Sequence, residues 1–142
     1  MIWVRIFQEH DRDALRRVYY ESRRHAFHWL RRTLFQLEDF DNDTEGERVW
    51  VAVKDNVPVG FAGIWEADNF LHHLYVAPEH LRQGIGSLLL STCMNSWRRP
   101  VTLKCMKSNR DAIRFYRKHG WFIESEGVSA MYGEYYLMKL DT

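Results

Sequence analysis

The chain of 142 residues is 46% hydrophobic and 15% aromatic, so a single packed domain (1–142) is expected and intrinsic disorder is excluded. Its 20 basic and 19 acidic side chains leave a net charge of +1, and this balance argues against nucleic acid or a membrane surface as a partner. No apolar run reaches the ~18 residues of a membrane span and the N-terminus has no apolar signal region, so we expect a soluble, cytoplasmic protein.

The first third of the chain predicts one strand followed by two helices. The segment 2–7 alternates loosely between apolar and polar residues, and Asp11 or Asp13 can cap the helix that follows. The apolar stripes of the two helices are Leu15, Val18, Tyr19 and Ser22, and then Phe27, Leu30, Leu34 and Leu37. The acidic segment 38–47 is expected to be a mobile loop, because nothing in it is suited to anchoring a core.

The rest of the chain predicts a sheet with two further helices. Asp55-Asn56 and Asp68-Asn69 mark tight turns, and Gly120 marks a helix end. The expected strands are 49–53, 57–65, 70–76, 101–106, 121–125 and 135–140, and the expected helices are 85–97 and 109–119. One strand–helix–strand crossover among several hairpins predicts the α/β class, with a mixed, mostly antiparallel central sheet of about seven strands flanked by about four helices.

Residues 70–87 combine the parts that hold a phosphate group. An apolar strand run ends before Pro78, which cannot continue a central strand, and Gly84-Ile85-Gly86 then opens an apolar helical run. Glycine lets the backbone approach an anion closely, and the first N–H groups of a helix point at it with the positive end of the helix dipole behind them. Glycines at a strand-to-helix turn are also common as plain turn residues, so this stretch alone does not decide a function.

A second motif lies in 109–121, and the two motifs together resemble a known family. In order and spacing they resemble the GNAT superfamily of N-acetyltransferases, whose acetyl-CoA signature is an apolar strand, a proline turn and an Arg/Gln-x-x-Gly-x-Gly/Ala loop. The downstream match reads Asn109-x-x-Ala112-x-x-Phe115-Tyr116-x-x-x-Gly120-Trp121, with Trp in place of the family's Phe. Leu81 stands where the family usually has Arg or Gln, and Arg82 stands where glycine is common.

The resemblance implies a GNAT fold and transfer of an acetyl group from acetyl-CoA, whose arm lies in a splay between the fourth and fifth strands. Backbone groups of Leu74 and Val76, on either side of Tyr75, would bond to the arm, and Asn109 would contact it. The residues implied around the pyrophosphate are Arg82, Gln83, Gly84, Ile85, Gly86 and Ser87. Tyr116 matches the family tyrosine that often protonates the leaving thiolate, and the alternative is a core tyrosine.

The attacking amine must lose a proton, and His72 is our candidate for the base that accepts it. Some family members that act on aromatic amines carry a histidine at the matching position, and an imidazole changes protonation near neutrality. Strand alternation places His72 on the face of Phe70 and Leu74, with His73 on the other face. The alternatives are proton loss through water and two runner-up bases, Glu66 and Glu124.

No metal site and no covalent intermediate on the enzyme are expected. His72, His73 and His80, or His25 and His28, resemble a ligand set, but no cysteine or carboxylate completes a known spacing, and the family needs no metal. The two cysteines are expected to be free, buried thiols: Cys93 and Cys105.

The residues do not choose the acceptor, which is a small-molecule amine or a peptide amino group. In the family, the first two helices, the acidic loop and the last hairpin border the splay, so we expect the acceptor pocket there. A rival reading is a CoA-binding sensor or structural module without transferase activity. A nucleic-acid-binding domain that uses the arginine-rich first helices ranks last. Both a monomer and a homodimer stay open.

Overall fold

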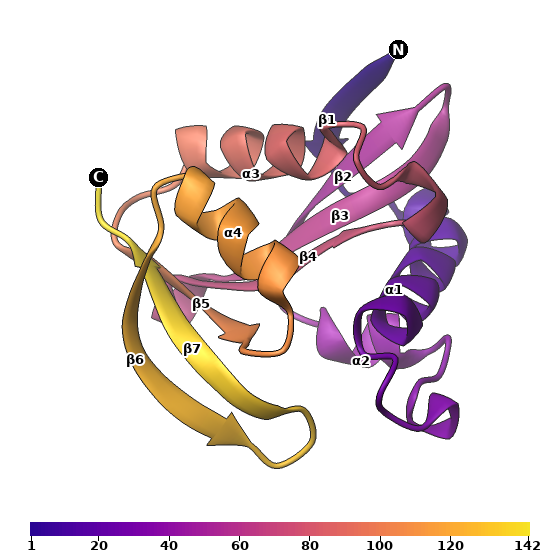
Figure 1. Ribbon diagram of the computed structural model, residues 1–142. Helices are drawn as coiled ribbons and strands as arrows, with labels where there is room; N and C mark the ends of the chain where they lie inside the picture. Colours follow the sequence, from indigo (N-terminus) through magenta and orange to yellow (C-terminus); the bar gives the residue numbers. More distant parts are fainter.

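The computed structural model describes residues 1–142 as seven strands and four α-helices (Figure 1). The strands are β1 (Ile2–Ile6), β2 (Arg48–Lys54), β3 (Val57–Trp65), β4 (Phe70–Val76), β5 (Val101–Met106), β6 (Phe122–Ser129) and β7 (Gly133–Leu140). The helices are α1 (Arg12–Ala26), α2 (Asp39–Asp43), α3 (Ile85–Asn95) and α4 (Arg110–Lys118). The predicted α/β class with a mixed, mostly antiparallel sheet is confirmed.

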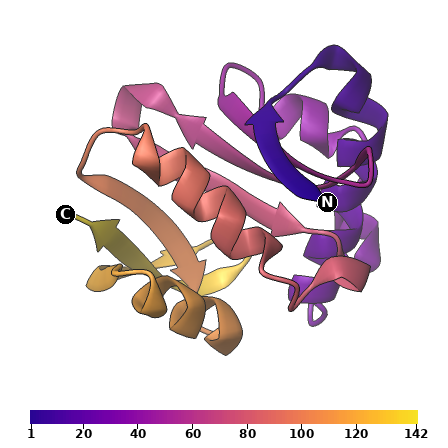
Figure 2. The ribbon, with the colours of Figure 1, turned by 90° about the horizontal axis from the view of Figure 1, so that it is seen from above.

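All seven strands form one sheet in the order β1-β2-β3-β4-β5-β7-β6. Every neighbouring pair is antiparallel except β4 and β5, which α3 connects as a parallel crossover. Helices α3 and α4 cover one face of the sheet, and α1 and α2 lie on the other (Figures 1 and 2). The sheet therefore separates two layers of helices, and β4 lies near its middle.

Strand β2 is apolar along its length because both of its faces are buried. Val51 and Val53 pack with α1 and α2, whereas Trp50 and Ala52 pack with α3. This alternation explains why the sequence shows a continuous apolar run there rather than a period of two.

The predicted second helix over 27–37 is wrong, because α1 ends before it and only a 3-10 turn, Arg32–Leu34, forms within it. Its apolar residues do not share a buried face. Phe27 is buried, while Leu34 and Leu37 are 44% and 45% exposed.

Asp39 accounts for the irregular path of this stretch. Its carboxylate accepts hydrogen bonds from the backbone N–H of Gln36 (2.8 Å) and from the guanidinium of Arg23 (3.0 Å). Arg23 is almost fully buried, with its guanidinium carbon 3.7 Å from the ring centre of Tyr19 and 4.7 Å from that of Phe35. A buried charge needs a partner, so this ion pair and the local capping bond outweigh continuation of the helix.

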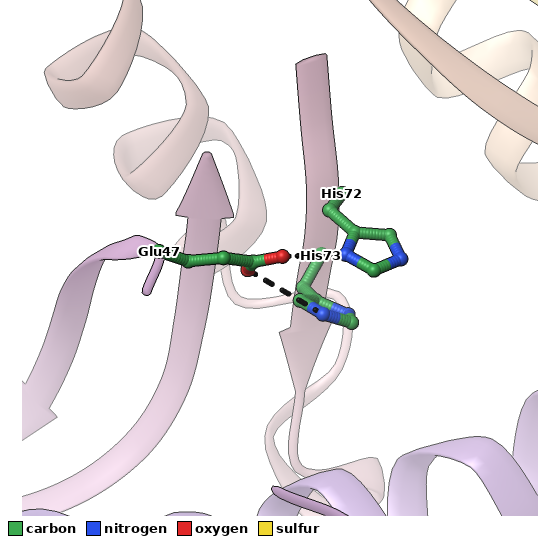
Figure 3. Close-up of side chains that lie close together, drawn as sticks. All are labelled: Glu47, His72 and His73. Atoms are coloured by element: carbon green, nitrogen blue, oxygen red, sulfur yellow. Dashed lines mark hydrogen bonds and ion pairs between the residues drawn. The ribbon is translucent and has the colours of Figure 1, made fainter. Parts of the chain in front are cut away.

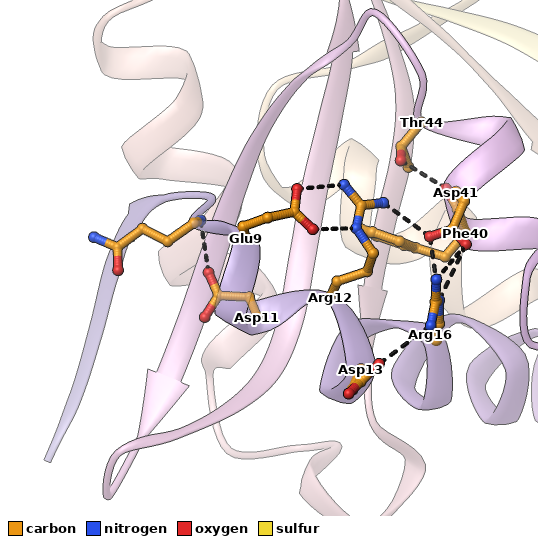
Figure 4. A network of polar contacts seen from close by, with 9 residues as sticks. Glu9, Asp11, Arg12, Asp13, Arg16, Phe40, Asp41 and Thr44 are labelled. Atoms are coloured by element: carbon orange, nitrogen blue, oxygen red, sulfur yellow. Dashed lines mark hydrogen bonds and ion pairs between the residues drawn. The ribbon is translucent and has the colours of Figure 1, made fainter.

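The expectation that 38–47 is a loop without a core anchor is also wrong. Helix α2 occupies its first half, and Phe40 is 1% exposed in the core beside α1. Asp41 accepts hydrogen bonds from Arg12 and Arg16 on α1, at 2.8 and 2.7 Å (Figure 4). The acidic segment is therefore tied to α1 by one aromatic ring and by ion pairs.

The remaining boundaries agree with the sequence to within a few residues. Strands β6 and β7 extend further toward their shared turn than predicted, and α3 ends at Asn95. None of the helices combines the length and the apolar character that crossing a membrane requires.

Candidate active site

Strands β4 and β5 separate after a single paired position. Phe70 aligns with Thr102, and no later residue of β4 pairs with β5, whereas β5 pairs with β7 along its whole length on its other edge. The second half of β4 is therefore paired with β3 on one side and open on the other. An opening of this kind leaves backbone N–H and C=O groups free to bond to a ligand.

In the second half of β4, the backbone groups of Leu74 and Val76 are directed away from β3. The N–H of Ala77 donates to Val59 of β3, whereas the carbonyl of Val76 faces away and accepts from Ser22 of α1 at 2.9 Å. Directions repeat every second residue in an antiparallel strand, so Leu74 also directs its backbone into the opening. The backbone of Tyr75 faces β3.

The loop between β4 and α3 contains two residues with positive φ. Gly84 precedes the first residue of α3 with φ of +79°, and Arg82 has φ of +64°. Glycine adopts this region without strain, which explains why glycine suits the position that Arg82 occupies.

The start of α3 is suited to an anion. No acidic residue lies in its first turn, and the N–H groups of Ile85, Gly86 and Ser87 have no helical acceptor. Gln83 accepts a hydrogen bond from Lys54 at the end of β2 (2.7 Å), so a lysine outside the motif adds positive charge beside the loop. Groups of this kind suit a phosphate.

The two sequence motifs meet at Gly86. A Cβ at this position would lie 3.6 Å from the ring of Phe115 on α4 and 3.9 Å from Val76 on β4. Asn109 caps α4, because its side-chain oxygen accepts from the N–H of Ala112 at 3.2 Å, and its amide NH₂ group makes no hydrogen bond in the protein. Its NH₂ group can therefore still donate to a ligand in the opening.

Tyr116 packs edge-on against Phe115 and Trp121, with ring centres 5.3 and 5.8 Å away. Burial raises the pKa of its phenol above the usual value of 10, and the nearby Cys105 and Tyr75 add to this effect. The hydroxyl therefore keeps its proton at neutral pH and can act as a proton donor.

His72 is the extra residue of a β-bulge. Strand β3 pairs Gly63 with His73 and its next residue with Leu71, which leaves His72 unpaired. A bulge turns a side chain to a new direction, so the predicted alternation is wrong at this point. The rings of His72 and His73 lie side by side with centres 4.0 Å apart, and Leu74 packs on the α3 face.

Glu47 joins the two histidines (Figure 3). Its Oε2 lies 2.5 Å from Nδ1 of His72, and its Oε1 lies 3.5 Å from Nε2 of His73. The side chain of Glu47 is only 3% exposed, whereas that of His72 is 47% exposed. A Cβ on Gly63 would lie 2.5 Å from Glu47 Oε1, so a glycine in β3 makes room for the carboxylate.

The hydrogen-bond partners of the two imidazoles show that a different ring nitrogen carries the proton in each. Nε2 of His73 lies 3.2 Å from the carbonyl of Asp43, which only accepts, so this nitrogen carries the proton. Burial lowers the pKa of His73 to about 3, with a further contribution from His72, so His73 stays neutral. Donation from Nδ1 of His72 to Glu47 leaves its Nε2 with a free lone pair on the exposed side.

His72 lines a pocket of about 280 Å³ where β3 ends and β4 begins. Its walls carry three carboxylates and two aromatic rings: Asp43, Glu45, Glu47, Trp65 and Phe70. A larger cleft of about 600 Å³ lies nearer β1, but its Arg12 and Asp41 already pair with each other. The smaller pocket is therefore the better candidate for an acceptor.

The sequence model described as the acetyltransferase (GNAT) family matches residues 5–121. The chain belongs to the GNAT acetyltransferase family. A curated relative, the peptidyl-lysine N-acetyltransferase YiaC of Escherichia coli, is 36% identical over 75 residues. The match spans 52% of this chain and 49% of the relative, so the chain matches about half the length of that protein.

Solved GNAT structures share the fold over the full chain. The PaiA N-acetyltransferase of Thermoplasma acidophilum, crystallised with coenzyme A, has a TM-score of 0.82 at 20% identity, covering 100% of this chain and 99% of that one. YncA of Salmonella typhimurium, a GNAT-fold structure with acetyl-CoA, has a TM-score of 0.75 at 19% identity, covering 99% and 94%. At these identities the likeness shows the fold alone.

The other side chains proposed for chemistry lie apart from this pocket. Glu66 pairs with Arg48 at 3.1 Å and Glu124 pairs with Lys139 at 3.0 Å, and neither lines the pocket. The predicted free, buried thiols are confirmed, and burial raises the pKa of both to about 12: Cys93 and Cys105.

Sequence reasoning missed Glu47 and Lys54, because each lies far along the chain from the motif that it joins. Gly63 was the available signal for Glu47, since a glycine inside a strand often marks a close approach by another group. The predicted roles of the cofactor-binding residues, His72 and Tyr116 stay predictions.

Proposed function

We propose that this GNAT protein transfers an acetyl group directly from acetyl-CoA to the primary amine of a small molecule or peptide. The observation that carries the proposal is the Glu47–His72 pair. It holds a free imidazole nitrogen at the wall of an acidic pocket, beside the opening between β4 and β5. A carboxylate behind a histidine orients the ring and fixes its tautomer, as a general base requires.

The residues of the opening fit acetyl-CoA. Unpaired N–H groups at the start of α3, with Lys54 beside them, suit the pyrophosphate, and the free edge of β4 suits the amides of the pantetheine arm. PaiA and YncA, which share the fold, were crystallised with coenzyme A and acetyl-CoA. When bound, acetyl-CoA supplies an acetyl group activated as a thioester.

Two side chains transfer protons during the reaction, one as a base and the other as an acid. The bound ammonium first loses one proton through Nε2 of His72 to solvent, and the neutral amine then attacks the thioester carbonyl. As the C–N bond forms, His72 accepts the second proton at Nε2 and later releases it to solvent. Tyr116 donates its hydroxyl proton to the sulfur while the C–S bond breaks, and it regains a proton from solvent. Each proton transfer of this kind typically contributes about 10²-fold or more to the rate.

The pocket favours a positively charged acceptor. Asp43 and Glu47 are hydrogen-bonded to Tyr19 and His72, and Glu45 adds a carboxylate without a partner in the protein, so the negative charge of the lining attracts an ammonium group. The rings of Trp65 and Phe70 are suited to an alkylammonium chain. The partial relative YiaC carries the name peptidyl-lysine N-acetyltransferase, and a lysine side chain has this shape and charge. Peptide lysines therefore belong among the first acceptors to test.

The test measures acetyl-CoA binding by calorimetry, and then thiol release in the same preparation with lysine peptides, N-terminal peptides, polyamines and amino acids. We expect saturable binding and release with one class of cationic amine. Release should fall at least about hundredfold in Tyr116→Phe, with cofactor affinity unchanged. Binding without release over the whole panel would favour the CoA-binding sensor, and absence of binding would overturn both readings.

A further inference from the structure

The cluster of Glu47, His72 and His73 has the composition of a metal site. The three side chains come from the segment before β2 and from β4, and one ligand atom of each lies within 4.8 Å of the others. Two imidazoles and one carboxylate are a donor set that zinc takes in proteins, with a fourth position left to water or another ligand. Imidazole donors favour zinc and its transition-metal neighbours over Mg²⁺ and Ca²⁺.

One atom of the cluster has an unmet bonding capacity. Oε1 of Glu47 is buried and has no hydrogen-bond partner, and the side chain that carries it is 3% exposed. A buried oxygen without a donor is costly, and its neighbour at 3.5 Å, His73 Nε2, is directed at the Asp43 carbonyl instead. A cation between the carboxylate and the two rings would satisfy this oxygen. His73 would bind it through Nε2, with the ring proton moved to Nδ1 and the contact of Nε2 with the Asp43 carbonyl given up.

We propose that Glu47, His72 and His73 bind a divalent transition-metal ion of the zinc type, and that its binding blocks the transfer reaction. The sequence led us to expect no metal, because no carboxylate stands at a ligand spacing from the histidines. The fold brings a carboxylate to the histidines. The bulge turns both histidines to one face, and the absence of a side chain at Gly63 leaves room for Glu47, which lies 25 residues before His72 in the sequence. The fourth position would face the pocket that His72 lines.

The blocking effect rests on the proposed function and follows from the two nitrogens of His72. A metal held at Nδ1 displaces the proton with which this nitrogen now donates a hydrogen bond to Glu47, and the neutral ring then carries its proton on Nε2. A protonated Nε2 cannot accept a proton from the amine. The opening between β4 and β5 and the start of α3 lie outside the cluster, so acetyl-CoA binding should be unaffected.

Metal binding is tested directly by titrating the full-length, chelator-treated protein with Zn²⁺ in a calorimeter. We expect one Zn²⁺ per chain, and a loss of affinity of at least about tenfold in both Glu47→Gln and His72→Gln. His28→Gln, in the exposed pair of His25 and His28, is the matched control and should bind Zn²⁺ as the unaltered chain does. Thermal unfolding without metal checks that the variants fold.

Two further readouts separate this proposal from the proposed function. Co²⁺ in the same site should give the intense visible absorption of four-coordinate cobalt, and His72→Gln should lose it. Zn²⁺ should lower thiol release while acetyl-CoA affinity stays constant. Failure of the chain to bind Zn²⁺, or equal binding by all the variants, would overturn the site even in an active enzyme. Zn²⁺ binding without inhibition would overturn the blocking role.

Discussion

The two sides of β4 are built in different ways. On the α3 side, the anion site consists of backbone groups from one continuous stretch, 74–87, with Lys54 as its one side chain from elsewhere. On the α1 side, the pocket consists of side chains brought together from distant segments, with Glu47 and His72 in contact across 25 residues of sequence. The proposed cofactor side is therefore built from backbone geometry within one stretch of chain, and the proposed acceptor side depends on long-range packing.

This difference predicts that the two sides respond separately to mutation. Substitutions on the α1 side should alter turnover without altering acetyl-CoA affinity. Substitutions at the start of α3 should alter acetyl-CoA affinity without altering turnover at saturating acetyl-CoA. The bulge at His72 connects the two sides, because it belongs to β4, whose unpaired edge borders the opening proposed for the cofactor.

The largest effect is expected for His72→Gln. Glutamine keeps much of the size and polarity of the half-exposed imidazole but cannot accept a proton at neutral pH, so turnover should fall about 10²- to 10³-fold. Steady-state kinetics measures the turnover of the variant, and calorimetry measures its acetyl-CoA affinity, which should be unchanged. An unchanged kcat would show that the amine loses its proton through water.

Tyr116→Phe should lower kcat about hundredfold, because the leaving sulfur loses its proton donor. The ring contacts with Phe115 and Trp121 are kept, so the free energy of unfolding and the cofactor affinity should not change. A kcat equal to that of the unaltered chain would identify Tyr116 as a packing residue. A thiol of lower pKa on the donor should recover part of the lost rate, which a purely structural effect would not explain.

Ser87→Asp tests the other side of the comparison. An acid in the first turn of α3 interacts favourably with the helix dipole, so the fold should be at least as stable as before. The same charge opposes the pyrophosphate, and acetyl-CoA affinity should fall at least about tenfold. Ser91→Asp places the same charge one turn further along and should change little. Equal losses in both variants would argue against the start of α3 as the phosphate site.

Gly63→Ala should lower turnover about tenfold through Glu47. The added Cβ would lie 2.5 Å from the carboxylate oxygen, so Glu47 must move away from His72. A double-mutant cycle checks this route: in a Glu47→Gln background the same substitution should have little further effect on turnover. Additive losses would show that Gly63 acts through the strand rather than through Glu47.

The smallest expected effect is a loss of folding stability at low pH on the α1 side of the sheet. Hydrogen bonds from Arg16 and Arg12 hold the pKa of Asp41 below its usual range. Burial alone would raise the pKa of Asp11, but Arg5 and the N–H of Gln8 lower it on balance. Carboxyls with lowered folded-state pKa values stabilise the fold above about pH 4 and lose this contribution as the pH falls below it. Hydrogen exchange should therefore show α1 and α2 opening before α3, and earlier protection loss in α3 would contradict this order.

The element types and the backbone conformation of 70–87 could be predicted from the sequence, because the residues that determine them follow one another along the chain. Strand, turn, glycines and helix start follow one another in 70–87, and even the conformation of Arg82 agrees with the position where glycine is common. The side-chain arrangement of the pocket could not be predicted in this way, because its residues come from segments that lie far apart in the sequence. A register shift at His72 placed His72 and His73 side by side instead of on opposite faces, and Asp39 and Arg23 replaced a predicted helix with an ion-paired turn. Phe40, which stands among acidic residues in the sequence, anchors the segment 38–47 that was predicted to be a mobile loop.

The most direct test of the account compares the unaltered chain with the His72→Gln, Tyr116→Phe double variant. Acetyl-CoA affinity is measured by calorimetry, and amine-dependent thiol release is measured on the same samples. We predict equal affinities and no measurable release by the double variant. Release that survives both substitutions, or an affinity that falls with it, would contradict the separation of a backbone cofactor site from a side-chain acceptor site.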